Sequence, residues 1–191
     1  MKRFALSTIL LFGLAACGGS EPAEDAVPAD ADPAAAEPVA DAAPGTPDWF
    51  RADGSTVEMD IVAGQTDVGQ YWNFNGAQNG DLTITVPVGA TVTINFQNND
   101  PNMGHSIGVA PDFGAPPAMI DATPVFEGAI SSNPASMVNA TMPGESEAIT
   151  FTASEAGEYT LVCYIPGHAV SGMWIRLVVS ADGEAGVSGS M

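Results

Sequence analysis

Three side chains in the C-terminal part of the sequence have the types and the spacing of metal ligands. Cys163, His168 and Met173 recur at intervals of five residues, and the only other histidine, His105, lies upstream at the start of an apolar segment. A thiolate, two imidazoles and a thioether form the mixed donor set that suits a single copper ion. The thiolate and thioether stabilise Cu(I), and the imidazoles accept Cu(II). The set therefore predicts a mononuclear type 1 copper site that exchanges one electron.

Each of these residues, taken alone, has a more ordinary interpretation. Cysteine and methionine are often simple packing residues in a core, and a histidine beside an apolar strand is often structural. The combination favours the metal, because both histidines of the sequence and one of its two cysteines belong to this set. Zinc binding and a metal-free, structural role stay open as alternatives.

The scarcity of histidine and cysteine also limits the reactions that the chain could catalyse. A Cys–His hydrolase needs an activated nucleophile and an oxyanion site, and no segment of the sequence indicates such a site. A multicopper oxidase or a nitrite reductase needs several more histidines than the two present. A dinuclear copper site needs a second cysteine in the loop, and the loop has none. The sequence therefore predicts no enzymatic activity and no small-molecule substrate.

The elements that must position these ligands are short segments of alternating apolar and polar residues. Gly, Asn, Asp and Pro separate the segments, and no window sustains an amphipathic helical pattern, so the pattern predicts an all-β sandwich or barrel. The long stretch 111–143 is expected to form loops around one or two strands. The other expected strands cover residues 56–62, 71–74, 81–86, 91–96, 105–110, 147–152, 158–163 and 173–179.

Strand alternation predicts where the candidate ligands point. Successive side chains of a strand face opposite sides of the sheet, so residues of one parity share a face. Three candidate ligands share that parity with apolar residues: Cys163 with Tyr159 and Leu161, Met173 with Ile175, Leu177 and Val179, and His105 with Ile107 and Val109. His168 lies between two strands, where Pro166 and Gly167 provide the turn that returns it toward Cys163. The three strand-borne candidates are therefore expected to point into the core, with His168 brought toward Cys163 by the turn.

The sequence from Cys163 to Met173, with Gly104-His105-Ser106 upstream, resembles the cupredoxins. Tyr71-Trp72-Asn73-Phe74-Asn75-Gly76 and Val86-Pro87-Val88-Gly89 are similar to the sulfocyanin and rusticyanin group, and the resemblance covers most of residues 71–179. It implies a Greek-key β-sandwich and one Cu(I)/Cu(II) ion held by His105, Cys163, His168 and Met173. It also implies electron transfer in the periplasm or at the outer-membrane face. The segment 98–103 does not match the family pattern, and the resemblance assigns no role to its residues.

The first 16 residues have the pattern of an export signal. Lys2 and Arg3 precede an apolar run too short to span a bilayer, and Leu14-Ala15-Ala16-Cys17 resembles a bacterial lipobox. We therefore expect a lipoprotein signal peptide at 1–16 and an acylated Cys17, with an ordinary signal peptide as the alternative. Such a protein is exported and lipid-anchored to a bacterial membrane, facing the periplasm or the cell exterior.

Composition divides the rest of the chain into three parts. Residues 17–47 consist mostly of Ala, Pro and acidic residues, which predicts a disordered linker that serves as a swinging stalk or as a spacer. Residues 48–182 contain the aromatic residues and the alternating segments, and they form the predicted copper domain. Residues 183–191 are dominated by Gly and Ser and are expected to be a flexible C-terminal tail.

The charge of the chain restricts its partners. The sequence has 23 Asp and Glu against four Lys and Arg, a formal net charge of -19. This excess excludes nucleic acid, whose phosphates need basic residues. It also excludes electrostatic attraction to anionic lipid, so the membrane is contacted only through the lipid anchor. A basic redox partner fits the charge, although adaptation to a saline habitat explains the same excess.

The apolar residues around His168 predict where a redox partner docks. Pro166, Ala169 and Val170 flank the histidine, whose ring edge is expected to emerge among them, and residues 115–120 extend the patch. We expect a membrane-tethered type 1 copper protein that shuttles single electrons between partners of a respiratory chain outside the cytoplasmic membrane. A c-type cytochrome or a terminal oxidase or reductase would be such a partner. The alternative is a copper-storage or copper-delivery lipoprotein with the same ligands, which predicts exchangeable metal without reversible cycling.

Overall fold

The computed structural model describes residues 46–190. The predicted signal peptide, the acylated Cys17 and the linker up to residue 45 lie outside these residues. The described chain is built from strands and one short 3-10 helix, η1 (Val68–Tyr71). No helix among the described residues has the length and apolar character needed to cross a membrane. The predicted all-β class is therefore confirmed.

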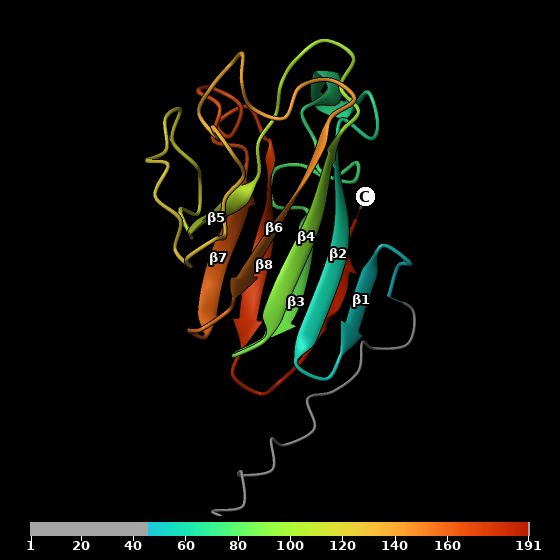
Figure 1. Ribbon diagram of the computed structural model, residues 1–191, viewed down its shortest axis with the longest axis vertical. Coiled ribbons are helices and arrows are strands. Elements are labelled where there is room, and N and C mark those ends of the chain that lie inside the picture. The colour runs from blue at the N-terminus through green and yellow to red at the C-terminus, as the bar shows by residue number, and fades with distance from the viewer. Residues whose placement is uncertain (1–45, 191) are drawn as a thin grey trace, which may run out of the picture. The chain divides into compact units, whose positions relative to one another are not determined.

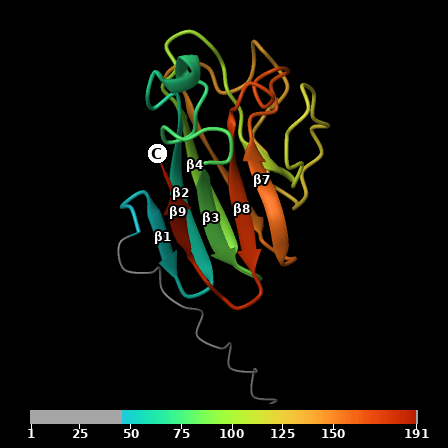
Figure 2. The same cartoon turned by 180° about the vertical axis from the view of Figure 1, so that it is seen from behind.

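The strands form two sheets that pack face to face (Figure 1). The first sheet has the order β1-β2-β4-β6, from β1 (Phe50–Asp53), β2 (Thr56–Ala63), β4 (Thr91–Asn98) and β6 (Ser146–Thr152). The second has the order β5-β7-β8-β3-β9, from β5 (Gly108–Pro111), β7 (Gly157–Val162), β8 (Trp174–Ser180), β3 (Leu82–Pro87) and β9 (Gly186–Gly189). Neighbouring strands are antiparallel, except for the parallel pairs β2–β4 and β3–β8. Figure 2, the view from behind, shows β3, β8 and β9 of the second sheet side by side.

Strand alternation places the core between the two sheets. In β2 the buried residues are every second one, including Met59 and Ile61, and in β4 they include Ile94 and Phe96. Each such side chain contributes about 1.5–3 kcal/mol when it leaves water. The residues that share parity with the candidate ligands belong to the same core, and Cys163 and Met173 lie in it with them. The prediction that these ligand side chains point into the core is confirmed for Cys163 and Met173.

The sheet that carries the ligands is covered on its outer face as well. Val162, Tyr164, Ala169 and Trp174 form a second buried cluster with Ala110. Phe113, Ile120 and Ile130 pack against this cluster from the loop that follows β5. This covering loop contains no strand. Two of its residues form isolated bridges with residues outside it, Ile130 with Gly108 and Thr141 with His105. The prediction of strands within 111–143 is therefore wrong.

A second predicted strand, residues 71–74, is replaced by a compact turn. Tyr71 has a φ value of 71°, in the left-handed region and outside the β region, and it follows Gly69 and Gln70, which both have φ values of 61°. The side-chain amide of Asn73 donates to the carbonyl oxygens of Thr66 and Val68 at 2.8 Å and thereby closes the turn. Local side-chain hydrogen bonds of this kind compete with strand formation. They outweigh the preference of the aromatic residues in this segment for a strand.

The C-terminal segment pairs with a sheet edge instead of fraying. The tail predicted at 183–191 contains β9, whose residues pair antiparallel with Leu82–Thr85 of β3. Ala185 and Val187 pack against the core. The edge of β3 offers unpaired N–H and C=O groups, and pairing with them needs no particular side chains. A segment rich in Gly and Ser can therefore form a strand here, although its composition does not predict one.

Candidate metal centre

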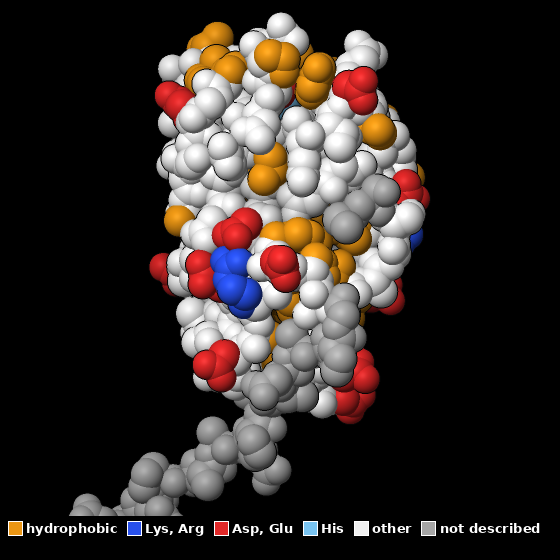
Figure 3. All heavy atoms as spheres, turned by 90° about the vertical axis from the view of Figure 1, so that its right-hand side faces the viewer, with side chains coloured by type: hydrophobic (Ala, Val, Ile, Leu, Met, Phe, Trp, Pro, Cys, Tyr) orange, Lys and Arg blue, Asp and Glu red, His pale blue; other side chains and the backbone are white. Residues whose placement is uncertain are grey.

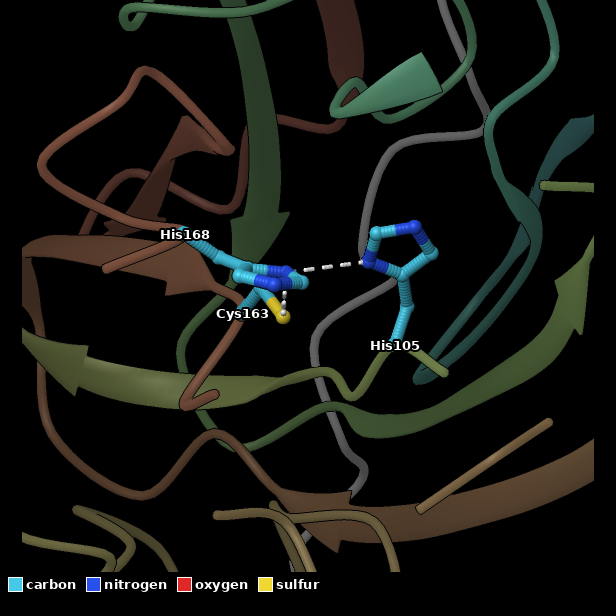
Figure 4. Close-up of side chains that lie close together, drawn as sticks. All are labelled: His105, Cys163 and His168. Carbon is cyan, nitrogen blue, oxygen red and sulfur yellow. Dashed lines mark hydrogen bonds between the residues drawn. The ribbon is translucent and has the colours of Figure 1, made fainter. Parts of the chain in front are cut away.

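Three predicted ligands converge at one end of the sandwich. The ligand atoms of His105, Cys163 and His168 all lie within 4.8 Å of one another, and all three residues are buried. Figure 4 shows the two rings and the thiol turned toward one another. The two Nδ1 atoms are 3.2 Å apart, and Nδ1 of His168 lies 3.5 Å from Sγ of Cys163. These separations are short enough for one metal ion to contact all three ligand atoms at once.

His105 is held by the turn that follows β4. Its backbone N–H donates to the carbonyl oxygen of Thr141 at 3.0 Å. Its Nε2 atom lies 2.8 Å from Oδ2 of Asp100, and both residues are buried. The second bond leaves the Nδ1 atom directed at the cluster. His105 thus precedes β5, which begins only at Gly108, so the expected strand 105–110 is shorter than predicted.

Cys163 directly follows β7 and is tied to the segment that carries His105. Its Sγ atom lies 3.6 Å from the hydroxyl oxygen of Ser106. The same hydroxyl oxygen accepts a hydrogen bond from the backbone N–H of Tyr164 at 2.9 Å. Ser106 therefore couples the two segments that provide the thiol and the first imidazole.

His168 lies in a tight turn between β7 and β8. Its backbone N–H donates to the carbonyl oxygen of Ile165, and its carbonyl oxygen accepts from the N–H of Met173 at 3.0 Å. Trp72 stacks on the imidazole, with ring centroids 4.1 Å apart and an interplanar angle of 18°. The turn and the tryptophan together restrict the orientation of the ring.

Met173 is fully buried and directly precedes β8. Besides its bond to His168, its carbonyl oxygen accepts a hydrogen bond from the N–H of Cys163 at 3.2 Å. The three residues of the loop are thereby joined through their backbones. The thioether lies in the same core as the thiol.

Burial controls the protonation of the cluster. Burial, and after it the proximity of His105, lowers the pKa of His168 to about 4, although Asp100 acts in the opposite direction. Burial also lowers the pKa of His105 against the raising effect of Asp100. Burial raises the pKa of the Cys163 thiol, while hydrogen bonds from Ser106 oppose the change. Near neutral pH both imidazoles are neutral and hold a free lone pair, and a metal ion would take the place of the thiol proton.

Three residues near the ligands were not assigned by the sequence. Trp72 belongs to a motif that resembles the family, and Ser106 follows His105, but neither pattern assigns a role to these side chains. Asp100 belongs to the segment that matched no pattern. The signal that could have identified it is its position five residues before a histidine, in a turn rich in Asn and Pro.

The structure corrects the expected docking surface in one respect. His168 and Ala169 are only 1% and 2% exposed, so neither the ring edge nor Ala169 emerges at the surface. The turn folds Ala169 against Tyr164 and Trp174. Pro166 is exposed, and Val170 is 56% exposed.

The donor set and its setting define the class of the protein. A buried thiol and two neutral imidazoles, with a buried thioether on the same loop, match the His₂Cys set with a weak axial methionine that characterises type 1 copper. No carboxylate belongs to this cluster. Together with the two-sheet sandwich, the site is that of a cupredoxin with one mononuclear copper ion held by His105, Cys163, His168 and Met173.

Comparisons with known proteins identify the family. The sulfocyanin (SoxE) domain model matches residues 49–186. The sulfocyanin of Sulfolobus acidocaldarius is 33% identical over 140 residues, which cover 69% of this chain and 67% of that protein. A rusticyanin of Acidithiobacillus ferrooxidans is 36% identical over 98 residues, which cover 51% of this chain and 49% of that protein. The chain belongs to the sulfocyanin family.

Two solved structures are also similar to this chain. The copper protein rusticyanin is 28% identical, with a TM-score of 0.43 over 69% of this chain and 87% of that one. Reduced auracyanin from Roseiflexus castenholzii is 26% identical, with a TM-score of 0.43 over 68% of this chain and 99% of that one.

Family membership and the copper site together establish the chemistry of the domain. The protein is a type 1 copper electron-transfer protein, and the copper ion supplies one-electron chemistry when it is bound. The protein chain holds the ligands, excludes water from them and limits their movement. A carrier of this kind is not an enzyme, as the scarcity of histidine predicted.

Proposed function

We propose that this protein is a lipid-anchored carrier that shuttles single electrons between partners of a respiratory chain outside the cytoplasmic membrane. The lipobox-like residues Leu14–Cys17 and the acidic, Pro-rich segment after them support the anchor and the tether. The acidic excess supports a basic partner, such as a cationic c-type cytochrome that delivers electrons or a terminal oxidase or reductase that accepts them.

The observation that carries the proposal is the burial of a ligand set that is already assembled. His105 and Cys163 are 0% exposed and His168 is 1% exposed. Rigid, water-excluded ligands favour a one-electron change, because they move little when the charge of the metal changes. A storage or delivery protein needs ligands that a second protein can reach. The burial of all three therefore favours the carrier over that alternative.

The contact region for the partner is proposed to lie over the copper loop, residues 163–173, which contains three of the four ligands. Val170 is 56% exposed and Met119 is 75% exposed. Their segments are adjacent, because the N–H of Gly167 donates to the carbonyl oxygen of Ala118 at 2.8 Å. Figure 3 shows the face that lies at the right of Figure 1, where separate hydrophobic side chains lie at the upper end of the domain.

The anchor is tested by expressing the full chain in a bacterium supplied with a palmitate analogue. The wild type should incorporate the label and sediment with membranes, and Cys17→Ala should do neither. Equal labelling of both proteins, or a wild type found only in the soluble fraction, contradicts the anchor.

The carrier is separated from the storage protein by two measurements on the copper-loaded protein. We expect an intense blue or green band that bleaches and returns over repeated reduction by a basic c-type cytochrome, with a rate that falls as salt rises. We also expect little loss of copper to an external chelator on the time scale of that cycle. Rapid transfer of copper to the chelator without reversible cycling would support storage or delivery instead.

A further inference from the structure

The buried carboxylate of Asp100 is a feature of the copper site that the four ligands do not explain. The residue is 2% exposed, and its Oδ2 atom lies 2.8 Å from Nε2 of His105, which is itself fully buried. Among the salt bridges of the described residues, Asp100 has no partner other than this histidine. A carboxylate is costly to bury without compensation, so the position of Asp100 calls for a role.

The contact determines which nitrogen of His105 faces the metal. A carboxylate only accepts hydrogen bonds, so the proton of the neutral imidazole lies on Nε2 and points to Asp100. The lone pair then lies on Nδ1, the atom that is 3.2 Å from Nδ1 of His168. Partners of this kind fix the tautomer and the ring orientation of a ligating histidine and raise its basicity.

The turn around Asp100 prevents its carboxylate from rotating away. Its Oδ1 atom accepts hydrogen bonds from the backbone N–H groups of Asn102 at 2.7 Å and Met103 at 3.2 Å. Its own N–H donates to Oδ1 of Asn98 at 2.9 Å. The side-chain amide of Asn98 donates to the carbonyl oxygens of Met103 and Thr141 at 2.8 Å. Both oxygens of Asp100 are thus engaged, and one of them is held against His105.

The second imidazole has no such partner among the described residues. Among the described residues, the His168 ring contacts Cys163 and His105 within the cluster through Nδ1 and stacks on the ring of Trp72. The two imidazoles of the site are therefore unequal: among the described residues, only His105 has a buried carboxylate in contact with its outer nitrogen.

We propose that Asp100 is a positioning residue that fixes His105 through Nε2 and shifts the copper site toward its oxidised state. A negative charge on the far side of the imidazole increases electron donation from Nδ1. Cu(II) gains more from this donation than Cu(I), because it carries the larger charge. Asp100 therefore lowers the reduction potential. The inference rests on the copper site alone and depends on neither the lipid anchor nor the partner.

The test compares Asp100→Asn with the wild type in the copper-loaded protein. The amide has nearly the same size as the carboxyl group, and its oxygen can still accept from Asn102 and Met103. Its NH₂ group cannot accept from Nε2 of His105, so the variant removes both the charge and the hydrogen bond to that ring. We expect the blue band to persist and the affinity for Cu(II) to fall about tenfold relative to that for Cu(I). For a one-electron couple this change raises the potential by about 59 mV. Spectroelectrochemical titration measures it.

Asp53→Asn is the matched control, because it removes the same charge from an exposed residue at the end of β1. Its potential should equal that of the wild type. A potential of Asp100→Asn that equals that of Asp53→Asn overturns the proposal. The wild-type blue band tests the copper site separately, so failure of the copper site and failure of the role of Asp100 are distinguishable.

A second measurement needs no variant and serves if Asp100→Asn does not fold. In the Cu(I) protein, nitrogen-15 NMR should show His105 protonated at Nε2, with a proton that exchanges with water much more slowly than that of His168. A His105 ring without a proton on Nε2, or with one that exchanges as fast as that of His168, overturns the proposal.

Discussion

Met173 provides the weakest donor of the copper site, and its side chain is fully enclosed by the core. A thioether is a soft, neutral donor that favours Cu(I) over Cu(II). An amide oxygen of similar reach is a harder donor and favours Cu(II). The identity of this one side chain therefore shifts the balance between the two oxidation states.

We expect Met173→Gln to lower the reduction potential by at least about 59 mV, the tenfold step of a one-electron couple. Potentiometric titration of the copper protein measures the shift. Met137→Gln is the control, because Met137 is 59% exposed and outside the ligand set. A rise in potential, or no change, contradicts the assignment of Met173 as the axial ligand.

The copper loop is the element that connects the site with the surface. It combines buried residues that hold the metal with Val170, which is 56% exposed. Since His168 is not itself exposed, an approaching protein contacts the residues that surround it. The loop therefore sets the distance between partner and copper.

We expect Val170→Asp to slow electron exchange with a basic c-type cytochrome about tenfold, because the contact would have to desolvate a carboxylate. Val88→Asp adds the same charge in the turn between β3 and β4 and should leave the rate close to that of the wild type. Stopped-flow absorption of the blue band measures both rates, and the band itself should not change. Equal rates for the two variants would exclude the loop as the docking element.

Strand β9 is an element whose contribution to stability can be measured by a pair of neighbouring substitutions. Val187 packs against the core, whereas the next residue, Ser188, is exposed. We expect Val187→Asp to lower the free energy of unfolding by about 2 kcal/mol, since it removes apolar burial and inserts a charge. Ser188→Asp should change it by less than about 0.5 kcal/mol. Urea denaturation measures both, and equal effects would mean that this segment is frayed in solution.

At the scale of the whole molecule, the acidic excess leaves few ion pairs within the described residues. Arg51 contacts both oxygens of Asp60 at 2.9 and 3.0 Å, and it contacts Glu58 at 3.2 Å. The hydrogen bond from Arg51, with a second from Asn95, lowers the pKa of Asp60. Arg51 thus joins β1 to β2 at the edge of the first sheet.

This ion pair predicts how stability depends on pH. Because the pKa of Asp60 is lower in the folded than in the unfolded protein, its contribution is present above the unfolded value and is lost as pH falls through the folded value. We expect Arg51→Met to be less stable than the wild type at pH 7 by at most about 1 kcal/mol, since the pair is exposed. The difference should shrink as the pH falls from 5 to 2. Urea denaturation at several pH values measures it, and a difference that stays constant would show that the pair is not responsible.

Across the whole molecule, the parts of the fold and of the site that could be predicted from the sequence are those that depend on local patterns. Strands such as Thr91–Asn98 follow from local alternation, because one face of each is buried and the other is not. The turn at residues 69–75 depends on hydrogen bonds from the Asn73 side chain, and strand β9 depends on backbone pairing with β3; the alternation of apolar and polar residues records neither. The burial of Ala169 also required the structure, because it packs with Tyr164, which follows β7, and with Trp174 of β8.

The sequence by itself determined the chemistry of this protein. Cysteine, histidine and methionine at a fixed spacing, with one further histidine, specify a copper site wherever the fold brings them together, because donor type is a property of the residue. Only the tertiary structure decided what surrounds those donors. Trp72 covers His168 because turns from different parts of the chain meet at one end of the sandwich, and no spacing along the sequence encodes that meeting. Asp100 is only five residues from His105, but its contact with the ring depends on how hydrogen bonds to Asn98, Asn102 and Met103 fold the turn between them.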